Sequence, residues 1–200
     1  GDTINMIDSL IMGTYFITVT DTLGCTDSDS AQVTEPNLLA VALINNQNVS
    51  CYDSANGELS AIVTGGTAPF TYLWSNLDTN QTADTLEDGF YSVIVIDAHG
   101  CSATSLPDTI TQPDSLYISA LTFTAVLCNG DNTGTAAVVA ADGTPGYSYL
   151  WSTGQTTDSI SNLLTGTYWV TVTDTNGCIR NSSIFVTEPD TLTTDSIVQD

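Results

Sequence analysis

Five cysteines carry most of the reactive chemistry in this 200-residue chain. Cys51 and Cys101 are 50 residues apart, and Cys128 and Cys178 have the same separation. A structural zinc site needs closely spaced cysteine or histidine ligands, but the sequence has no C-x-x-C pair and only one histidine. The cysteines are therefore candidates for disulfide bonds rather than for metal binding.

The charge balance excludes several classes of partner. The chain has 23 acidic residues and one basic residue, Arg180, which gives a formal charge of −22. Binding to nucleic acids and to anionic membrane surfaces both depend on groups of Lys and Arg. The apolar runs in the sequence are too short to cross a bilayer. We therefore expect no nucleic-acid partner and no membrane insertion, although the 42% hydrophobic content suffices for packed cores.

Internal repeats organise the chain. The segment 89–101 matches 166–178, and 13–25 is a third copy that also runs from a Gly-x-Tyr to a Gly-Cys. Tyr72-Leu73-Trp74-Ser75 recurs at 149–152. Every offset between neighbouring copies is 76 or 77 residues, which is the length of one small domain.

The offsets divide the chain into two full units, 37–113 and 114–189. Residues 1–36 align with the C-terminal part of a unit, and 190–200 align with its first strand. We interpret the chain as a window cut from a longer array. Each unit ends in an acidic or amide residue followed by proline, and proline restricts both itself and its neighbour. These joints, at 35–36, 112–113 and 188–189, predict a stiff and nearly linear array.

The apolar residues inside a unit alternate as they do in β-strands. Tyr168, Val170 and Val172 alternate with the residues between them, and turn-forming Gly and Asn bracket the strands. We count about seven short strands per unit and no amphipathic helix. The pattern predicts an all-β fold of tandem Ig-like or PKD-like antiparallel β-sandwiches. Trp74 and Trp151 are expected in the cores, and the Tyr of each Gly-x-Tyr, such as Tyr91 and Tyr168, near a sheet corner.

The second full unit carries a recognisable pattern: Cys128-Asn129-Gly130, Asp142-Gly143-Thr144-Pro145, Tyr149-Leu150-Trp151-Ser152 and Asn176-Gly177-Cys178. This pattern resembles the SprB-type repeat. Such repeats occur in tandem in very large surface proteins of Bacteroidota, including gliding-motility adhesins exported by the type IX secretion route. The resemblance implies an extracellular, cell-surface protein. It supplies no ligand, because such repeats are mostly spacers.

Placing the cysteines on the repeat suggests a pairing within each unit, Cys51 with Cys101 and Cys128 with Cys178. Cys25 is then the second cysteine of a truncated unit, and its partner is expected outside the chain. Closing a loop this long is worth about 4 kcal/mol in the chain-entropy model. The alternative joins Cys25 to Cys51 and Cys101 to Cys128 across unit boundaries.

Aspartate precedes a hydroxyl residue unusually often. Of 19 aspartates, 14 are followed by Ser or Thr, far more than the composition predicts, and 11 of these continue with Ala, Ile or Leu. This resembles the O-glycosylation signal of Bacteroidota, so we expect covalent glycans at several of these positions. The alternative is ordinary turn chemistry. The candidate acceptors are Thr3, Ser9, Thr22, Ser30, Ser54, Thr85, Thr109, Ser115, Ser159, Thr191 and Ser196.

Calcium is a weaker expectation. Hard cations need several oxygen atoms that converge from a loop. Asp53, Asn56 and Glu58 lie near the first cysteine of one unit, and Asp131 occupies a similar place in the next. None has the spacing of a complete calcium loop, so we name them only as candidates and expect no other cofactor.

Catalysis is not expected. His99 is the only conventional general base, and the sibling copies have Leu23 and Asn176 in the same turn. A single arginine and no lysine leave little for phosphate transfer or Schiff-base chemistry. No two acidic residues stand out as a glycosidase pair.

Two functions fit the sequence. The first is a non-catalytic structural segment of a stalk or filament in a large surface adhesin, whose partners are neighbouring repeats or other copies in a fibre. The second is a module that binds a carbohydrate or a surface, with or without calcium. Phe16 and Trp169 belong to the strand face opposite the predicted core and would be its contact residues. The middle unit has Ser92 at this position, which weighs against a shared binding face.

Overall fold

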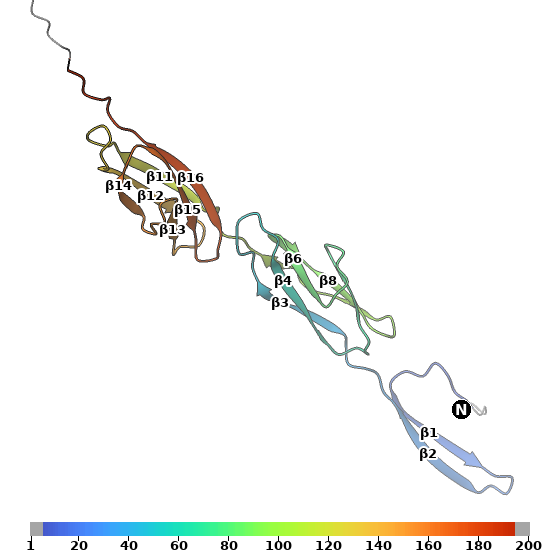
Figure 1. Cartoon of the computed structure of the whole chain (residues 1–200). Helices are drawn as coiled ribbons and strands as arrows, with labels where there is room; N and C mark the ends of the chain where they lie inside the picture. Colours follow the sequence, from blue (N-terminus) through green and yellow to red (C-terminus); the bar gives the residue numbers. More distant parts are fainter. Residues whose placement is uncertain (1–5, 195–200) are drawn as a thin grey trace, which may run out of the picture. The chain divides into compact units, whose positions relative to one another are not determined.

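The computed structural model describes residues 6–194 (Figure 1). All regular elements in this part are β-strands, and all recorded strand pairs are antiparallel. The all-β prediction is therefore confirmed. The chain divides into two compact units. One is drawn from Gly1–Ala42, Ala61–Gln81 and Ser92–Leu106, and the other from Leu43–Ser60, Thr82–Tyr91 and Pro107–Asp200.

The last repeat shows the sandwich most completely. Its first sheet has the strand order β11-β12-β14, and its second has the order β13-β15-β16. The strands are β11 (Tyr117–Thr124), β12 (Gly134–Ala141), β13 (Ser148–Trp151), β14 (Ser159–Leu163), β15 (Gly166–Thr173) and β16 (Ile179–Val186). Alternate residues of β12 and β15 are buried, as a sheet with one face on a core requires.

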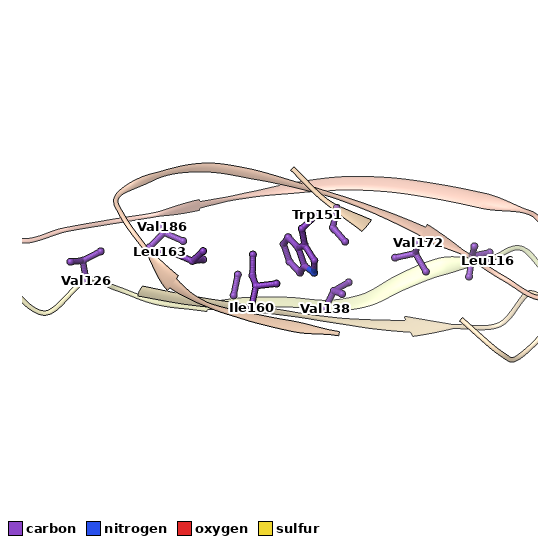
Figure 2. Packing of buried hydrophobic residues seen from close by; sticks show 10 residues of the cluster. Leu116, Val126, Val138, Trp151, Ile160, Leu163, Val172 and Val186 are labelled. Carbon is purple, nitrogen blue, oxygen red and sulfur yellow. The ribbon is translucent and has the colours of Figure 1, made fainter. Parts of the chain in front are cut away.

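A core of ten buried residues fills the space between these two sheets (Figure 2). Trp151 lies at its centre with 2% of its surface exposed, and its indole nitrogen donates a hydrogen bond to the carbonyl of Thr157 at 2.9 Å. Val138 and Ile160 come from the first sheet, whereas Val172 comes from the second. The prediction that Trp151 is a core residue is confirmed.

The middle repeat has the same order of strands with more interruptions. Its sheets have the orders β3-β4-β6 and β5-β8-β9, with a separate pair β10-β7. Trp74 is 1% exposed and donates to the carbonyl of Asn80 at 2.8 Å, as Trp151 does in its own repeat. The strands are β3 (Ala40–Gln47), β4 (Gly57–Thr64), β5 (Thr71–Trp74), β6 (Thr82–Leu86), β7 (Gly89–Tyr91), β8 (Val93–Ile96), β9 (Ser102–Thr104) and β10 (Asp108–Ile110).

The middle and last repeats therefore contain eight and six strands, where the sequence predicted about seven in each. Two strands of the last repeat are each divided in the middle repeat: β15 corresponds to β7 and β8, and β16 corresponds to β9 and β10. In the middle repeat, Pro107 lacks the backbone N–H that a continuous ladder needs, and the chain is divided into β9 and β10. Ser183 stands at the equivalent place in the last repeat, where β16 is unbroken.

The N-terminal segment forms a two-stranded hairpin from β1 (Gly13–Thr20) and β2 (Thr26–Val33). The predicted sheet-corner tyrosine is confirmed in all three copies. The hydroxyl of Tyr15 donates to the carbonyl of Ile11 at 2.9 Å. Tyr91 and Tyr168 donate in the same way to the carbonyls four residues before them, at 3.2 and 3.0 Å. This bond fixes the entry of each copy into its Gly-x-Tyr strand.

Candidate functional site

An aspartate organises the turn that carries the second cysteine of each repeat. In the last repeat, Asp174 Oδ1 accepts hydrogen bonds from the backbone N–H groups of Asn176 and Cys178, both at 2.9 Å. Its Oδ2 accepts from the N–H of Thr144 at 2.8 Å. Asp174 is only 5% exposed, so it is a buried acceptor that ties two loops together.

The same arrangement recurs at the earlier positions. Asp97 Oδ1 accepts from the N–H groups of His99 and Cys101 at 2.9 Å, and its Oδ2 accepts from Thr67 at 3.0 Å. In the N-terminal copy, Asp21 accepts from the N–H of Cys25 at 2.8 Å. No structural role was predicted for these aspartates from the sequence. The available signal was an aspartate four residues before each second cysteine.

Replacing Asp174 by asparagine is expected to destabilise the last repeat by about 1–3 kcal/mol, the cost of an unsatisfied buried polar group. An amide has one acceptor oxygen, so its NH₂ group would face at least one of the three backbone donors. Urea unfolding measured by circular dichroism tests this. Asp190→Asn, a change at an exposed carboxylate, is the control. An Asp174→Asn midpoint equal to that of the control would contradict the assigned role.

Asp97 should make stability depend on pH. Burial raises the pKa of Asp97, but the hydrogen bonds from the backbone of Cys101, Thr67 and His99 outweigh it, and the pKa is lowered overall. A folded pKa below the unfolded value of about 3.9 means that the stabilisation is fully present above that pH. It is lost as the pH falls through the lower folded value.

The free energy of unfolding should therefore fall less steeply with acid in Asp97→Asn than in the parent chain. The advantage of the parent over the variant should shrink as the pH is lowered from about 5 to below the folded pKa. Urea unfolding across this range measures it, with Asp88→Asn, at an exposed position, as the control. A constant difference at every pH would count against ionised Asp97 as the stabilising form.

The loop that carries the first cysteine is tied to the joint at the end of its repeat. Gln112 Oε1 accepts from the N–H of Asp53 at 2.7 Å, and Glu188 Oε2 accepts from the N–H of Gly130, at the equivalent place, at 2.9 Å. Each acceptor directly precedes the joint proline. The joint residues therefore hold the first cysteine loop in position, in addition to any stiffness that the prolines supply.

The two cysteines of one repeat lie at opposite ends of it. In the last repeat, Cys178 borders a hollow lined by Ser115 and Leu116, which precede β11, whereas Cys128 follows the end of β11. β11 has eight residues, which span about 26 Å at 3.3 Å each. A disulfide needs Cα atoms within about 7 Å. Pairing within a repeat is therefore excluded by the length of the sandwich.

The structure instead joins Cys51 to Cys178, with the Cα atoms 5.6 Å apart. The predicted pairs Cys51–Cys101 and Cys128–Cys178 are wrong for the reason just given. The alternative pairs Cys25–Cys51 and Cys101–Cys128 are not formed either, because Cys25, Cys101 and Cys128 are free and exposed. The observed bond links the first cysteine of one repeat to the second cysteine of the next.

Further contacts accompany this disulfide. The side-chain amide of Asn176 donates to the carbonyl of Ser50 at 2.9 Å, directly beside Cys51. The adjoining hollow is lined by Cys51 and Tyr52 of one repeat and by Leu116 and Cys178 of the next. The Asn-Gly turn thus provides a hydrogen bond to the chain beside Cys51 as well as a hairpin corner.

The glycosylation candidates are accessible in most cases. Ser54 and Thr109 are half-buried, and the other candidates within the described residues are exposed: Ser9, Thr22, Ser30, Thr85, Ser115, Ser159 and Thr191. Thr3 and Ser196 lie outside the described residues. Some candidates also bond to their own aspartate: the hydroxyls of Thr85 and Ser159 donate to Asp84 and Asp158, at 3.0 and 3.1 Å. Turn chemistry and accessibility for modification therefore coexist.

The calcium candidates are engaged with other groups. Asn56 Oδ1 accepts from the N–H of Ser50 at 2.9 Å, and Glu58 Oε1 accepts from the side chain of Asn46 at 2.7 Å. Asp53 and Asp131 belong to different first-cysteine loops. Among residues 6–194, no three His, Cys, Asp or Glu side chains are grouped closely enough to hold a metal ion.

The possible contact residues are on the surface. Phe16 is 81% exposed and Trp169 is 60% exposed, whereas Ser92 is half-buried. Phe185, 55% exposed, is paired with Thr167 in the ladder and so lies diagonally from Trp169 on the same outer face. His99 is exposed too, in the turn that Asp97 organises.

Comparison with known proteins gives matches to one family model and to several solved structures. Solved structures that resemble the chain include the N-terminal eight Ig domains of Down Syndrome Cell Adhesion Molecule, at 14% identity and a TM-score of 0.44 over 88% of this chain. The chain spans 27% of that structure. Extracellular domains 3–5 of Drosophila OTK match over 90% of this chain and 72% of their own length, at 12% identity and a TM-score of 0.36.

A tetra-tandem repeat from the extending region of a large adhesion protein matches over 90% of this chain and 58% of its own length, at 16% identity and a TM-score of 0.25. No curated protein matches. Within the described residues, no helix is long and apolar enough to cross a membrane.

The family model of the SprB repeat matches residues 44–79 and 120–156. The two matches begin at corresponding places in the two full units and cover the loop of the first cysteine and the tryptophan strand in each. The resemblance expected from the sequence is confirmed, because the SprB repeat model matches one segment in each of the two full units.

Proposed function

We propose that this chain is a non-catalytic structural segment of a long extracellular stalk or filament in a surface adhesin. The observation that carries the proposal is the bond between Cys51 and Cys178, which makes a covalent link between consecutive SprB repeats. A spacer must transmit tension without coming apart, and a covalent link at the joint serves that purpose. The packed tryptophan core and the bonds of Gln112 and Glu188 at the joints serve it too.

The setting follows from the same features. Disulfides persist in oxidising compartments outside the cytosol, which suits a surface protein exported by the type IX route. The shortage of Lys and Arg leaves trypsin-like proteases a single site, Arg180. Exposed Asp-Ser and Asp-Thr sites, such as Ser30 and Thr191, are open to O-glycosylation, and glycans there would shield the surface further.

Native material from the source cells tests this proposal. Antibodies against the chain are expected to label intact cells, and the denatured, non-reduced protein should have a mass many times the 21.0 kDa of this sequence. Peptides that contain the Asp-Ser and Asp-Thr sites should carry sugar mass increments. A discrete species at 21.0 kDa that is found only inside the cell would refute the surface-stalk function.

A second candidate function rests on Trp169 and Phe185, which expose neighbouring aromatic rings on one sheet face. Aromatic faces of this kind stack on sugars, so a carbohydrate-binding or surface-binding role is the alternative, with or without calcium. Binding of the whole chain to glycan arrays, with and without added Ca²⁺, distinguishes the two functions. Binding that is lost in both Trp169→Ala and Phe185→Ala would favour the binding module over the spacer.

A further inference from the structure

The free cysteines at the two ends of the repeats stand where the bonded cysteines stand in their siblings. Cys128 is equivalent to Cys51, and Cys101 is equivalent to Cys178, with an offset of 77 residues in both cases. Cys51 and Cys178 are half-buried in their mutual contact, whereas Cys101 and Cys128 are exposed. Cys101 and Cys128 therefore occupy the same positions in their repeats as the bonded cysteines, but neither is opposite a partner cysteine.

The surface around Cys101 resembles the surface around Cys178, the second-cysteine side of the observed bond. Beside Cys178 the hollow is lined by Ser115 and Leu116, together with Cys51 and Tyr52 of the preceding repeat. Beside Cys101 the hollow is lined by Leu38 and Leu39, the equivalents of Ser115 and Leu116. Asp97 holds the Cys101 turn as Asp174 holds the Cys178 turn. This side is preformed for a first-cysteine loop.

The surface around Cys128 resembles the surface around Cys51, the first-cysteine side of the observed bond. Its loop is fixed by Glu188, just as the Cys51 loop is fixed by Gln112. Leu127, which precedes Cys128, is 73% exposed, whereas its equivalent Ser50 is half-buried and accepts the hydrogen bond from Asn176. Leu192 lines the hollow beside Cys128 and is 97% exposed, although its equivalent Leu116 is 6% exposed.

We propose that Cys101 and Cys128 are sites of inter-repeat disulfides of the same kind. Cys128 takes the second cysteine of a following SprB repeat, and Cys101 takes the first cysteine of a preceding one. In each case two thiols lose two protons and two electrons and form one S–S bond. A disulfide oxidant such as oxidised glutathione accepts the electrons by thiol–disulfide exchange. At every joint of an array, a disulfide would then link the first cysteine of one repeat to the second cysteine of the next.

This inference rests on the repeat geometry and not on the surface-stalk function, so the two can fail separately. An intracellular location would refute the function and leave the pairing rule intact. An altered disulfide map would refute the rule and leave the location intact.

The test adds one repeat to the whole chain. Residues 114–189 are duplicated directly after Pro189, which gives seven cysteines, because the copy adds two to the five present. The protein is oxidised with a glutathione redox buffer, digested with an Asp-specific protease without reductant, and mapped by mass spectrometry. The expected links are Cys51–Cys178 and Cys128 to the copy of Cys178. Three thiols should remain, whereas pairing within repeats would leave only one.

Two variants sharpen the result. Cys128→Ser in the extended chain should abolish only the new link and raise the thiol count from three to four. Cys101→Ser, the matched control, should leave both links in place and lower the count from three to two. Circular dichroism and tryptophan fluorescence check that each variant is folded. A folded extended chain in which Cys128 stays a thiol, or is linked to Cys178, overturns the proposal.

Discussion

Replacing Trp151 by alanine should cost the last repeat about 3–5 kcal/mol, the usual range for emptying a large aromatic site in a core. Trp151 is 2% exposed, lies between the two sheets, and uses its only side-chain hydrogen-bond donor on the carbonyl of Thr157 (Figure 2). Small domains have total stabilities of about 5–15 kcal/mol. The substitution should therefore leave this repeat marginally stable or unfolded at room temperature.

Trp169→Ala is the matched control, because Trp169 is 60% exposed and lies in the same repeat. Its effect should stay within about 0.5 kcal/mol, as for most surface changes. Urea unfolding followed by far-UV circular dichroism measures both variants. Equal midpoints for Trp151→Ala and Trp169→Ala would contradict the central place of Trp151 in the core.

Removing the disulfide should have an effect of similar size. The bond closes a loop with a sequence separation of 127 residues. In the chain-entropy model a loop of this length is worth about 5 kcal/mol when the whole enclosed segment unfolds. Cys51→Ser should therefore unfold at a much lower urea concentration than the oxidised parent, and reductant should bring the parent down to the level of the variant.

Cys101→Ser is the control for this experiment, because Cys101 is free and exposed. Its midpoint should equal that of the parent with and without reductant. If stabilisation instead depended on a bond between Cys51 and Cys101, the two variants would lose stability equally, and the observed pairing would be refuted. A reductant effect that is absent from all three proteins would show that the loop closure contributes nothing.

Much of the fold could be predicted because the governing signals are local. The alternation of Tyr168, Val170 and Val172 reflects a strand with one buried face, and it required no knowledge of partners. The comparison of copies placed Trp74 and Trp151 at equivalent core positions, and the Gly-x-Tyr pattern placed the corner tyrosines. Strand counts were less accurate, because two strands of the middle repeat are divided, one of them at Pro107.

The disulfide could not be predicted from spacing because its partners are brought together by the joint between two repeats. The equal 50-residue separations within each repeat suggested pairs that the length of β11 rules out. Cys51 follows β3, at the end of the folded repeat that carries the joint to the next one. Cys178 lies beside Leu116, at the end of the next repeat that adjoins the same joint. The pairing is decided by which ends of the folded repeats carry the cysteines, and the spacing of cysteines in the sequence does not contain this information.

The central claim is that one covalent link spans two consecutive repeats, and stretching the whole chain from its ends tests it most directly. In an oxidised molecule the fully stretched chain should be shorter by the 127 residues that the disulfide encloses, which is about 440 Å at roughly 3.5 Å per residue. Reductant added to the same molecules should release this length. A deficit of about 350 Å, which is the sum for two 50-residue loops at the same rise, would contradict the claim. So would an extension that reductant does not change.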